Sequence, residues 1–441
     1  MSRRASALLA VLLAIGLAAC ADWASVPLSA GTGPNPALPP PAQRWFPTVN
    51  IAPAVGWMPG AVPQPASGLR VNAFARDLDH PRWLLVLPNG DVLVAESNAP
   101  ARTDRSAGIR QWLSGLVMKI AGAGVPSANR ITLLRDTDHD GVADLRTVLL
   151  EGLNSPFGMA LVDDQLYVAN TDAVLRFPYV TGQTRIELPG VKLADLPAGP
   201  INHHWTKNLI VDPAGEQLYV TVGSNSNVAE RGMALEEQRA AIWAIDRRSG
   251  RHRIFASGLR NPNGLAWEPQ TRTLWTVVNE RDELGSDLVP DYLTSVREGD
   301  SFGWPHTYFS SHVDVRVTSP RPAGQAVARV PDYALGAHTA PLGLAWSAHS
   351  TLLPRFGQGM FIGQHGSWNR RPHSGYNVVF VPFEAGRPSS APPLEVLTGF
   401  LTDGGRAQGR PVGVAIDARG ALLVADDVGN VIWRVSPDER R

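Results

Sequence analysis

The chain has 441 residues, of which 44% are hydrophobic and 18% are charged, a composition typical of a folded globular protein rather than a disordered one. Its 40 basic and 40 acidic residues cancel, so no broad positive field favours nucleic acid or an anionic membrane surface. Nucleic acid is therefore not an expected partner.

The N-terminus carries the pattern of an export signal. Arg3 and Arg4 precede the apolar run ALLAVLLAIGLAA, which is too short for a comfortable membrane span but suits a signal peptide. The run ends in Cys20, the only cysteine, and the ending LAAC resembles the lipobox of bacterial lipoproteins. The resemblance implies a signal segment over residues 1–20, acylation of Cys20, and anchoring by lipid at the periplasmic face of a bacterial membrane. The alternative is an ordinary cleavage site beside an incidental cysteine.

Residues 21–68 form a proline-rich linker. Eleven of the 37 prolines lie between Ala21 and Pro65. Prolines at this density lack backbone donors and favour extended conformers. We expect a stiff tether or strap that takes no part in a sheet and holds the following domain off a membrane.

From Leu69 to the C-terminus, units of two apolar runs joined by a polar turn repeat along the chain. Four of the six units open with Pro-x-Gly, whose proline and glycine we assign to the turn that enters the strand. The units begin at His80, Ser155, His203, Asn261, Ala340 and Arg410. Each predicts a β-hairpin, and six similar hairpins predict an all-β, six-bladed β-propeller over residues 69–441. A pair of β-sandwiches is the alternative, and it fits six evenly built units less well.

The residues just before these prolines differ between units and include Arg260, Asn261 and Arg410. Because equivalent positions of the blades lie around one end of a propeller, we expect their side chains to converge there.

A separate acidic motif, DTDHDGVAD, spans Asp136 to Asp144. It places carboxylates at relative positions 1, 3, 5 and 9 and glycine at position 6, the spacing of a calcium-binding loop. Position 12 is threonine, where an EF-hand has a bidentate glutamate. We interpret Asp136, Asp138, Asp140 and Asp144 as a structural calcium loop between two blade strands. A metal-free turn is the alternative.

Six motifs of the propeller region resemble, in the same order, those of the soluble glucose/sorbosone dehydrogenases, and the sorbosone-type branch most of all. The motifs are HWTKNL, GLRNPNGLAW, NERDELGSDL, GDSFGWPH, HGSWNR and GRPVGVAID. The resemblance implies a six-bladed propeller that uses pyrroloquinoline quinone (PQQ) and Ca²⁺. It also implies oxidation of an aldose or sorbosone-like sugar by hydride transfer, with electrons passing to a cytochrome or a quinone.

The resemblance implies roles for particular residues. A histidine that titrates near neutral pH suits removal of a hydroxyl proton, and guanidinium groups suit a developing oxyanion or a carboxylate. The matched residues are His204 as the base, Arg260 and Asn261 against the quinone, Arg410 on the cofactor, Lys207 and Arg370 as further cofactor contacts, and Glu280 and Asp282 at the calcium of the cofactor.

Three positions depart from the pattern of the glucose enzymes. Ser224 replaces the aspartate that orients the histidine, Arg281-Asp282 replaces a Gly-Pro pair that offers carbonyls to calcium, and Val412 replaces a second arginine. Apart from the resemblance, His204 could cap a strand end, and Arg260 could pair with Glu280 or Asp282 at the rim. The alternative function is a propeller that binds a carbohydrate or an envelope partner without redox chemistry.

Overall fold

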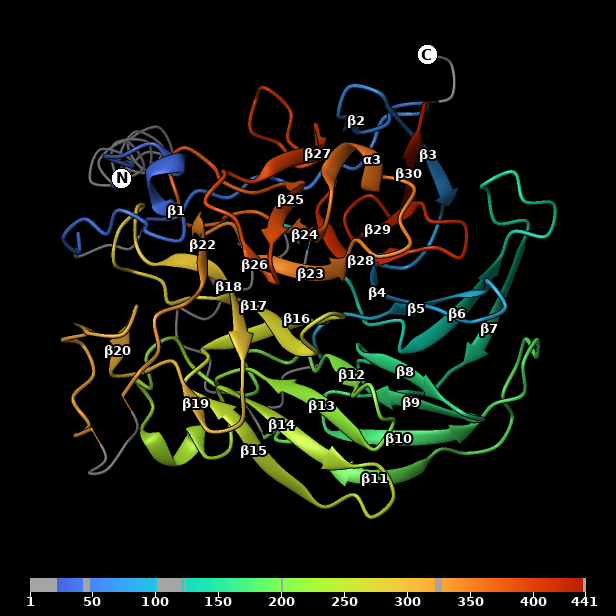
Figure 1. The fold of residues 1–441 in the computed structure, drawn as a ribbon, viewed down its shortest axis with the longest axis horizontal. Helices are drawn as coiled ribbons and strands as arrows, with labels where there is room; N and C mark the ends of the chain where they lie inside the picture. Colours follow the sequence, from blue (N-terminus) through green and yellow to red (C-terminus); the bar gives the residue numbers. More distant parts are fainter. Residues whose placement is uncertain are drawn as a thin grey trace, which may run out of the picture.

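The computed structural model describes residues 22–42, 48–100, 120–122, 124–199, 201–321 and 327–438. Viewed down the short axis, the innermost strands of six sheets surround a central axis, and the sheets radiate from it as blades (Figure 1). The predicted all-β six-bladed propeller is therefore confirmed. The signal segment and Cys20 lie outside the described residues.

Each blade is an antiparallel sheet whose four main strands run in order from the axis outward. The first three blades consist of β4 (Pro81–Val86), β5 (Val92–Glu96), β6 (Arg130–Arg135) and β7 (Leu145–Leu150); β8 (Met159–Val162), β9 (Gln165–Ala169), β10 (Ala173–Pro178) and β11 (Val191–Asp195); and β12 (Leu209–Val211), β13 (Gln217–Val222), β14 (Ala241–Asp246) and β15 (His252–Ser257). The last three consist of β16 (Asn261–Glu268), β17 (Thr273–Asn279), β18 (Pro290–Val296) and β22 (Tyr333–Ala337); β23 (Pro341–Trp346), β24 (Gly359–Gln364), β25 (Asn377–Glu384) and β27 (Leu394–Thr398); and β28 (Pro411–Ile416), β29 (Leu422–Asp426), β30 (Val431–Pro437) and β3 (Leu69–Ala75).

The six units seen in the sequence are the inner hairpins of the six blades, as predicted. In the sixth blade, for example, Pro411 pairs with Asp426 across β28 and β29. The outer strand of this blade is β3, from the N-terminal side, so the first and last strands of the propeller close the ring together. Short elements complete the fold: β19 (Asp300–Ser301), the hairpin of β20 (Thr307–Tyr308) and β21 (His312–Val313), β26 (Arg387–Pro388), η1 (Leu28–Gly31), η2 (Met233–Glu236) and α3 (Leu353–Phe356).

The glycine of Pro-x-Gly has a different role from the one expected. It lies within the innermost strand of its blade, or directly before it at Gly158, and faces the innermost strand of the next blade. A Cβ on Gly158 would lie 2.1 Å from the backbone nitrogen of Leu209, and one on Gly343 would lie 2.2 Å from the carbonyl oxygen of Val412. The glycine is therefore required because neighbouring blades approach closely at the axis, and not because the chain turns there.

The proline-rich segment is a strap that packs on the propeller, and the expectation that it stays outside the sheets is wrong. Its strand β1 (Thr32–Gly33) pairs with β22, and β2 (Gln64–Pro65) pairs with β27. Each pairing is only two residues long, and of the scattered prolines only Pro65 lies within one. Ala52 of the strap is fully buried.

The hydrophobic core lies between neighbouring blades. Trp275 and Trp433, on the middle strands β17 and β30, are almost completely buried and contact aromatic rings at 4.9 and 5.3 Å between centroids. Most described tryptophans thus pack in the core. No helix among the described residues is long and apolar enough to cross a membrane.

Candidate functional site

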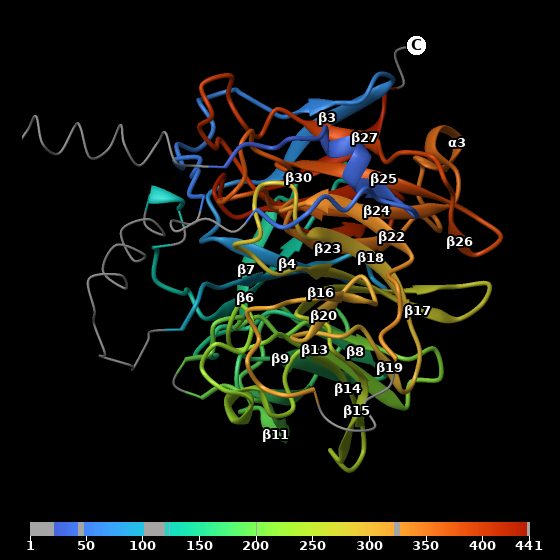
Figure 2. The same cartoon turned by 90° about the vertical axis from the view of Figure 1, so that its left-hand side faces the viewer.

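Two sets of residues meet at one end of the propeller because of the strand directions. In every blade the first strand begins, and the second strand ends, at this same end, which we call the mouth. The connection that carries α3 joins the end of β23 to the start of β24 and therefore marks the opposite end (right in Figure 2). Polar residues that precede a first strand or follow a second strand accordingly converge at the mouth.

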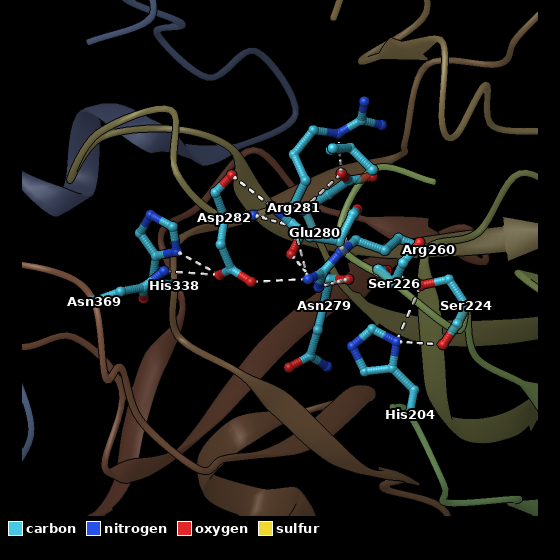
Figure 3. A network of polar contacts seen from close by, with 12 residues as sticks. His204, Ser224, Ser226, Arg260, Asn279, Glu280, Arg281, Asp282, His338 and Asn369 are labelled. Atoms are coloured by element: carbon cyan, nitrogen blue, oxygen red, sulfur yellow. Dashed lines mark hydrogen bonds and ion pairs between the residues drawn. The ribbon is translucent and has the colours of Figure 1, made fainter. Parts of the chain in front are cut away.

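His204 lies before β12 and is fixed by the residue that follows β13. Its Nδ1 is 2.8 Å from the carbonyl oxygen of Ser224 and 3.0 Å from the Ser224 hydroxyl (Figure 3). Because a carbonyl only accepts and that hydroxyl donates to Ser226, Nδ1 carries the hydrogen and Nε2 keeps a lone pair. Burial lowers the pKa of His204 well below its usual value, and the positive charge of Arg260 lowers it further. His204 is therefore a neutral proton acceptor.

Arg260, directly before β16, has its donors occupied by the protein. It donates from Nε to the carbonyl of Asn227, from Nη1 to the carbonyl of Glu280 at 2.6 Å, and from Nη2 to Asp282 at 2.8 Å. Nη2 also reaches the side-chain oxygen of Asn227 at 2.9 Å. The rim ion pair that the sequence left open thus exists, with Asp282 and not with the Glu280 carboxylate.

Asp282 links Arg260 to the neighbouring blade. Its Oδ1 accepts from the side-chain nitrogen of Asn369 at 2.8 Å and lies 3.7 Å from Nδ1 of His338 (Figure 3). Burial opposes ionisation of Asp282, but Arg260 and His338 outweigh it and hold its pKa below the usual value. Burial alone would lower the pKa of His338, and Asp282 reverses this and raises it. Asp282 is therefore the counter-charge of Arg260 and, when the ring is protonated, of His338.

Glu280 and Asp282 are the predicted calcium ligands at the cofactor, and an arginine already neutralises the carboxylate of each. Glu280 accepts from Nε of Arg281 at 3.0 Å, while Asp282 pairs with Arg260. The Arg281 side chain is fully buried and also donates to the carbonyls of Pro305 and Thr307, at 2.7 Å each. The structure brings a guanidinium, rather than a vacant set of oxygens, to this loop, and a metal role for this pair stays a prediction.

A second group, the Asp427 cluster, lies at the mouth on the first, fifth and sixth blades. Asp427 follows β29, and its Oδ2 is 2.9 Å from Nε2 of His365, 3.5 Å from Nε2 of His80, and hydrogen-bonded to Arg82. Burial alone would raise the pKa of Asp427, but these three partners lower it. Arg410, whose carbonyl accepts from the Asp427 backbone, adds a further positive charge, so the cluster has more cations than anions.

Arg410 has unused donors. Its Nε and Nη2 are buried without a hydrogen-bond partner among the described residues, and its guanidinium lies 4.9 Å from the Tyr376 ring centroid. Buried guanidinium atoms normally have a partner, and the fork of Arg410 suits a carboxylate. These orphaned donors fit an anionic cofactor such as one with several carboxylates.

The remaining predicted cofactor residues are Asn261, Arg370 and Lys207, and they differ in how far the protein already occupies their polar atoms. Asn261 is buried, and its Oδ1 has no partner among the described residues. Arg370 is also buried, donates to the carbonyl of Pro372 at 2.8 Å and lies 3.8 Å from Asp287. Lys207 has no exposed surface and donates to the Trp205 carbonyl at 3.1 Å, so it braces the His204 loop and does not face a ligand.

The motifs in the sequence did not point to His80, Arg82, His365 or Asp427. The comparison of the residues before the Pro-x-Gly prolines does not include His80 or Arg82, because their unit lacks the full motif, and it does not include the residues that follow the second strands. The residues that follow the second strands are also polar and differ between units, and this pattern could have pointed to His365 and Asp427. These residues are Asn170, Ser224, Glu280, His365 and Asp427.

The acidic loop lies between β6 and β7, as predicted, and docks on the sixth blade, where Asn72 donates to the carbonyl of Gly141 at 2.8 Å. Ligand atoms of Asp136, Asp138 and Asp140 lie within 4.8 Å of one another, so these three carboxylates could hold one ion. Asp144 is outside this group, because its carboxylate accepts from the backbone and the hydroxyl of Thr137.

The sequence matches the TrAA12-like family over residues 124–295 and 316–438. The chain belongs to the TrAA12-like family. An uncharacterized protein of Borreliella burgdorferi is 27% identical over 293 residues, which are 64% of this chain and 76% of that protein.

Two solved structures of this TrAA12-like fold are similar over most of their length. The calcium structure of the family AA12 protein of Trichoderma reesei has a TM-score of 0.68 at 17% identity, covering 89% of this chain and 100% of that one. The holo form of the PQQ domain of pyranose dehydrogenase from Coprinopsis cinerea has a TM-score of 0.65 at 19% identity, covering 88% and 100%. At these identities the likeness establishes the shared fold.

Proposed function

We propose that this protein is a quinoprotein oxidoreductase that oxidises an aldose or a sorbosone-like sugar with PQQ bound at the mouth. The observation that carries the proposal is the buried, unpaired Nε and Nη2 of Arg410 at the same end as His204. Arg410 would hold a carboxylate of the cofactor, and Asn261 and Arg370 would contact it nearby. When bound, PQQ would supply the acceptor that takes a hydride from the sugar carbon.

The chain would supply the proton chemistry. Nε2 of His204 would accept the hydroxyl proton of the sugar while the carbon–oxygen bond becomes a carbonyl. Ser224 holds the ring in the required tautomer but offers no charge to an imidazolium. The positive charge of Arg260 keeps His204 neutral to lower pH. The donors of Arg260 are already occupied. To polarise a quinone oxygen, Arg260 would have to give up one of its present hydrogen-bond acceptors in exchange for that oxygen.

The proposal also includes a structural calcium site and a location in the cell. We propose that Asp136, Asp138 and Asp140 bind a structural Ca²⁺, and that the protein is exported and anchored by lipid on Cys20 at the periplasmic face of a bacterial membrane. Electrons would pass to a cytochrome or a membrane quinone. Incorporation of labelled palmitate, abolished by Cys20→Ser, tests the anchor.

The second candidate is an envelope propeller that binds a carbohydrate or protein without redox chemistry. The saturated donors of Arg260 and the neutral Ser224 favour it. Purified protein incubated with PQQ and Ca²⁺ and assayed with a dye acceptor over a panel of sugars separates the two. Sugar-dependent dye reduction that needs PQQ supports the oxidoreductase, whereas sugar binding without dye reduction supports the alternative.

A further inference from the structure

The strap contributes to the architecture of the mouth from its first described residue. Asp22 accepts from the backbone of Ser286 at 2.6 Å, and Ala24 donates to the carbonyl of Arg371 at 2.7 Å. Ser286 lies in the loop that carries Glu280 and Asp282, and Arg371 lies in the loop that carries His365 and Asn369. The segment just after Cys20 is therefore attached to the two loops that hold the Asp282 network.

The strap then continues around the mouth to the Asp427 cluster. Asn50 donates to the carbonyl of Trp368 at 2.8 Å, and the Trp57 indole donates to Asp426 at 2.7 Å. Asp426 in turn accepts from the backbone of Arg410 at 2.8 Å. Residues 22–24 thus contact the loops of the Asp282 network, and residues 50–57 contact the side of the mouth that holds the Asp427 cluster.

Large apolar side chains are exposed beside these contacts. Their exposed fractions are 63% for Trp23, 42% for Val49, 41% for Val55, 71% for Met58 and 41% for Trp368. We call these five residues the rim patch. The two exposed tryptophans of the described part of the chain both belong to it, whereas most described tryptophans are buried or packed against the core. Exposed tryptophan with neighbouring apolar residues is typical of a surface that enters the interface of a bilayer.

We propose that the mouth docks on the lipid bilayer through the rim patch. The inference rests on the proposed lipid anchor, because Cys20 is only two residues before Asp22, and two residues span at most about 7 Å. An acyl chain at Cys20 therefore holds Trp23 within reach of the lipid headgroups. Apolar side chains that enter the interface would add a second contact beside the lipid anchor. This orientation brings the redox site beside the membrane, where a lipid-soluble quinone would be reduced.

The test measures which end of the lipidated, full-length mature protein is covered by lipid. Met58→Cys places a thiol in the rim patch, and Val180→Cys is the matched control, because Val180 is 69% exposed at the β10–β11 turn of the opposite end. Cys20 is the only native cysteine, and acylation blocks it. We expect a bulky maleimide to label both thiols equally in detergent, and to label Met58→Cys several-fold more slowly in phosphatidylcholine vesicles.

Trp23→Ser together with Trp368→Ser should restore fast labelling of Met58→Cys while the anchor remains. Equal labelling of Met58→Cys and Val180→Cys on vesicles would overturn the proposal. Protection only in native membranes would overturn it as well, because a protein would then cover the patch. If palmitate labelling fails, the anchor is wrong, and co-sedimentation of the unlipidated chain with vesicles decides docking by itself. Sedimentation lost with the two tryptophans supports docking, and no sedimentation contradicts it.

Discussion

Nη2 of Arg260 donates to Oδ2 of Asp282 over 2.8 Å, with the arginine buried and only 18% of the aspartate side chain exposed. This ion pair fixes the arginine that the family resemblance places against a quinone. Arg410, on the sixth blade, instead has two buried guanidinium nitrogens, Nε and Nη2, that lack a partner among the described residues. Arg260 and Arg410 therefore differ: the protein occupies the donors of Arg260, and two donors of Arg410 are ready for a ligand.

Removing the charge of Asp282 should destabilise the fold. Asp282→Asn leaves Arg260 buried without a counter-charge, and we expect the free energy of unfolding to fall by about 3 kcal/mol. Asp163→Asn is the matched control, because Asp163 pairs with Arg247 at 3.2 Å but is 72% exposed. Urea denaturation should show a change of less than about 1 kcal/mol in the control. Equal losses in both variants would contradict the assignment.

A carboxylate at position 224 should change the pH profile of the enzyme. Because the neutral form of His204 is the base, we expect kcat/KM to fall only at pH values well below 6.5, the usual pKa of histidine. Ser224→Asp places a negative charge beside Nδ1 and should raise the pKa of His204, moving the acid limb upward by about 1 pH unit or more. An unchanged acid limb in an active Ser224→Asp protein would argue against His204 as the base.

Loss of Arg410 should weaken the cofactor more than the fold. Arg410→Gln removes a charged hydrogen-bond donor, for which we expect PQQ affinity to fall by about 10-fold to 100-fold. Fluorescence titration measures this. Arg185→Gln, at an exposed pair with Glu151, should leave the affinity unchanged. Wild-type affinity in Arg410→Gln would mean that the orphaned donors serve another purpose.

Calcium should raise the melting temperature through the acidic loop. Chelation should lower the temperature again, since an ion that binds only the folded state stabilises it by mass action. Asp138→Ala removes one of the three converging carboxylates and should abolish the response. Asp144→Asn, which alters only the contact with Thr137, should retain it. If calcium raised the melting temperature of Asp138→Ala as much as that of the wild type, the acidic loop would not be the calcium site.

The Asp427 cluster should make the fold sensitive to mild acid. Burial lowers the pKa of His80 from 6.5 to about 4, so the unfolded chain binds a proton in this range that the folded chain does not. Stability is therefore complete above pH 6.5 and falls as the pH drops toward 4, by about 3 kcal/mol in total from this group. His80→Asn, which tolerates the φ of 54° at this position, should flatten the dependence between pH 7 and pH 4.5. If the stability of His80→Asn depended on pH as steeply as that of the wild type, groups other than His80 would cause the effect.

The sequence repeat predicted the fold because the residues of each unit specify a hairpin by themselves. Alternating apolar residues and a polar turn specify two adjacent strands, and six copies specify the ring. The glycine of Pro-x-Gly was correctly seen as structural, but its reason, contact with the next blade, depends on a neighbour far away in the sequence. The strap was misjudged because proline density describes the local chain and not the surface on which it packs.

The site was only partly predictable for a similar reason. His204, Arg260 and Arg410 followed from motifs, and the structure brings all three to one end. Which arginine has free donors could not be predicted, because the partners of Arg260 come from two loops that are distant in the sequence, one with Asn227 and one with Glu280 and Asp282. The cluster around Asp427 likewise joins three blades that are distant in the sequence.

The most direct test of the central claim follows the absorbance of PQQ bound to the purified protein as sugar is added without any other acceptor. We expect saturable binding of PQQ, followed by reduction of the bound cofactor by an aldose or a related sugar. His204→Gln should bind PQQ with similar affinity and reduce it at least about 100-fold more slowly, as expected for loss of a general base. Absence of PQQ binding, or reduction at an equal rate in His204→Gln, would contradict the proposed function.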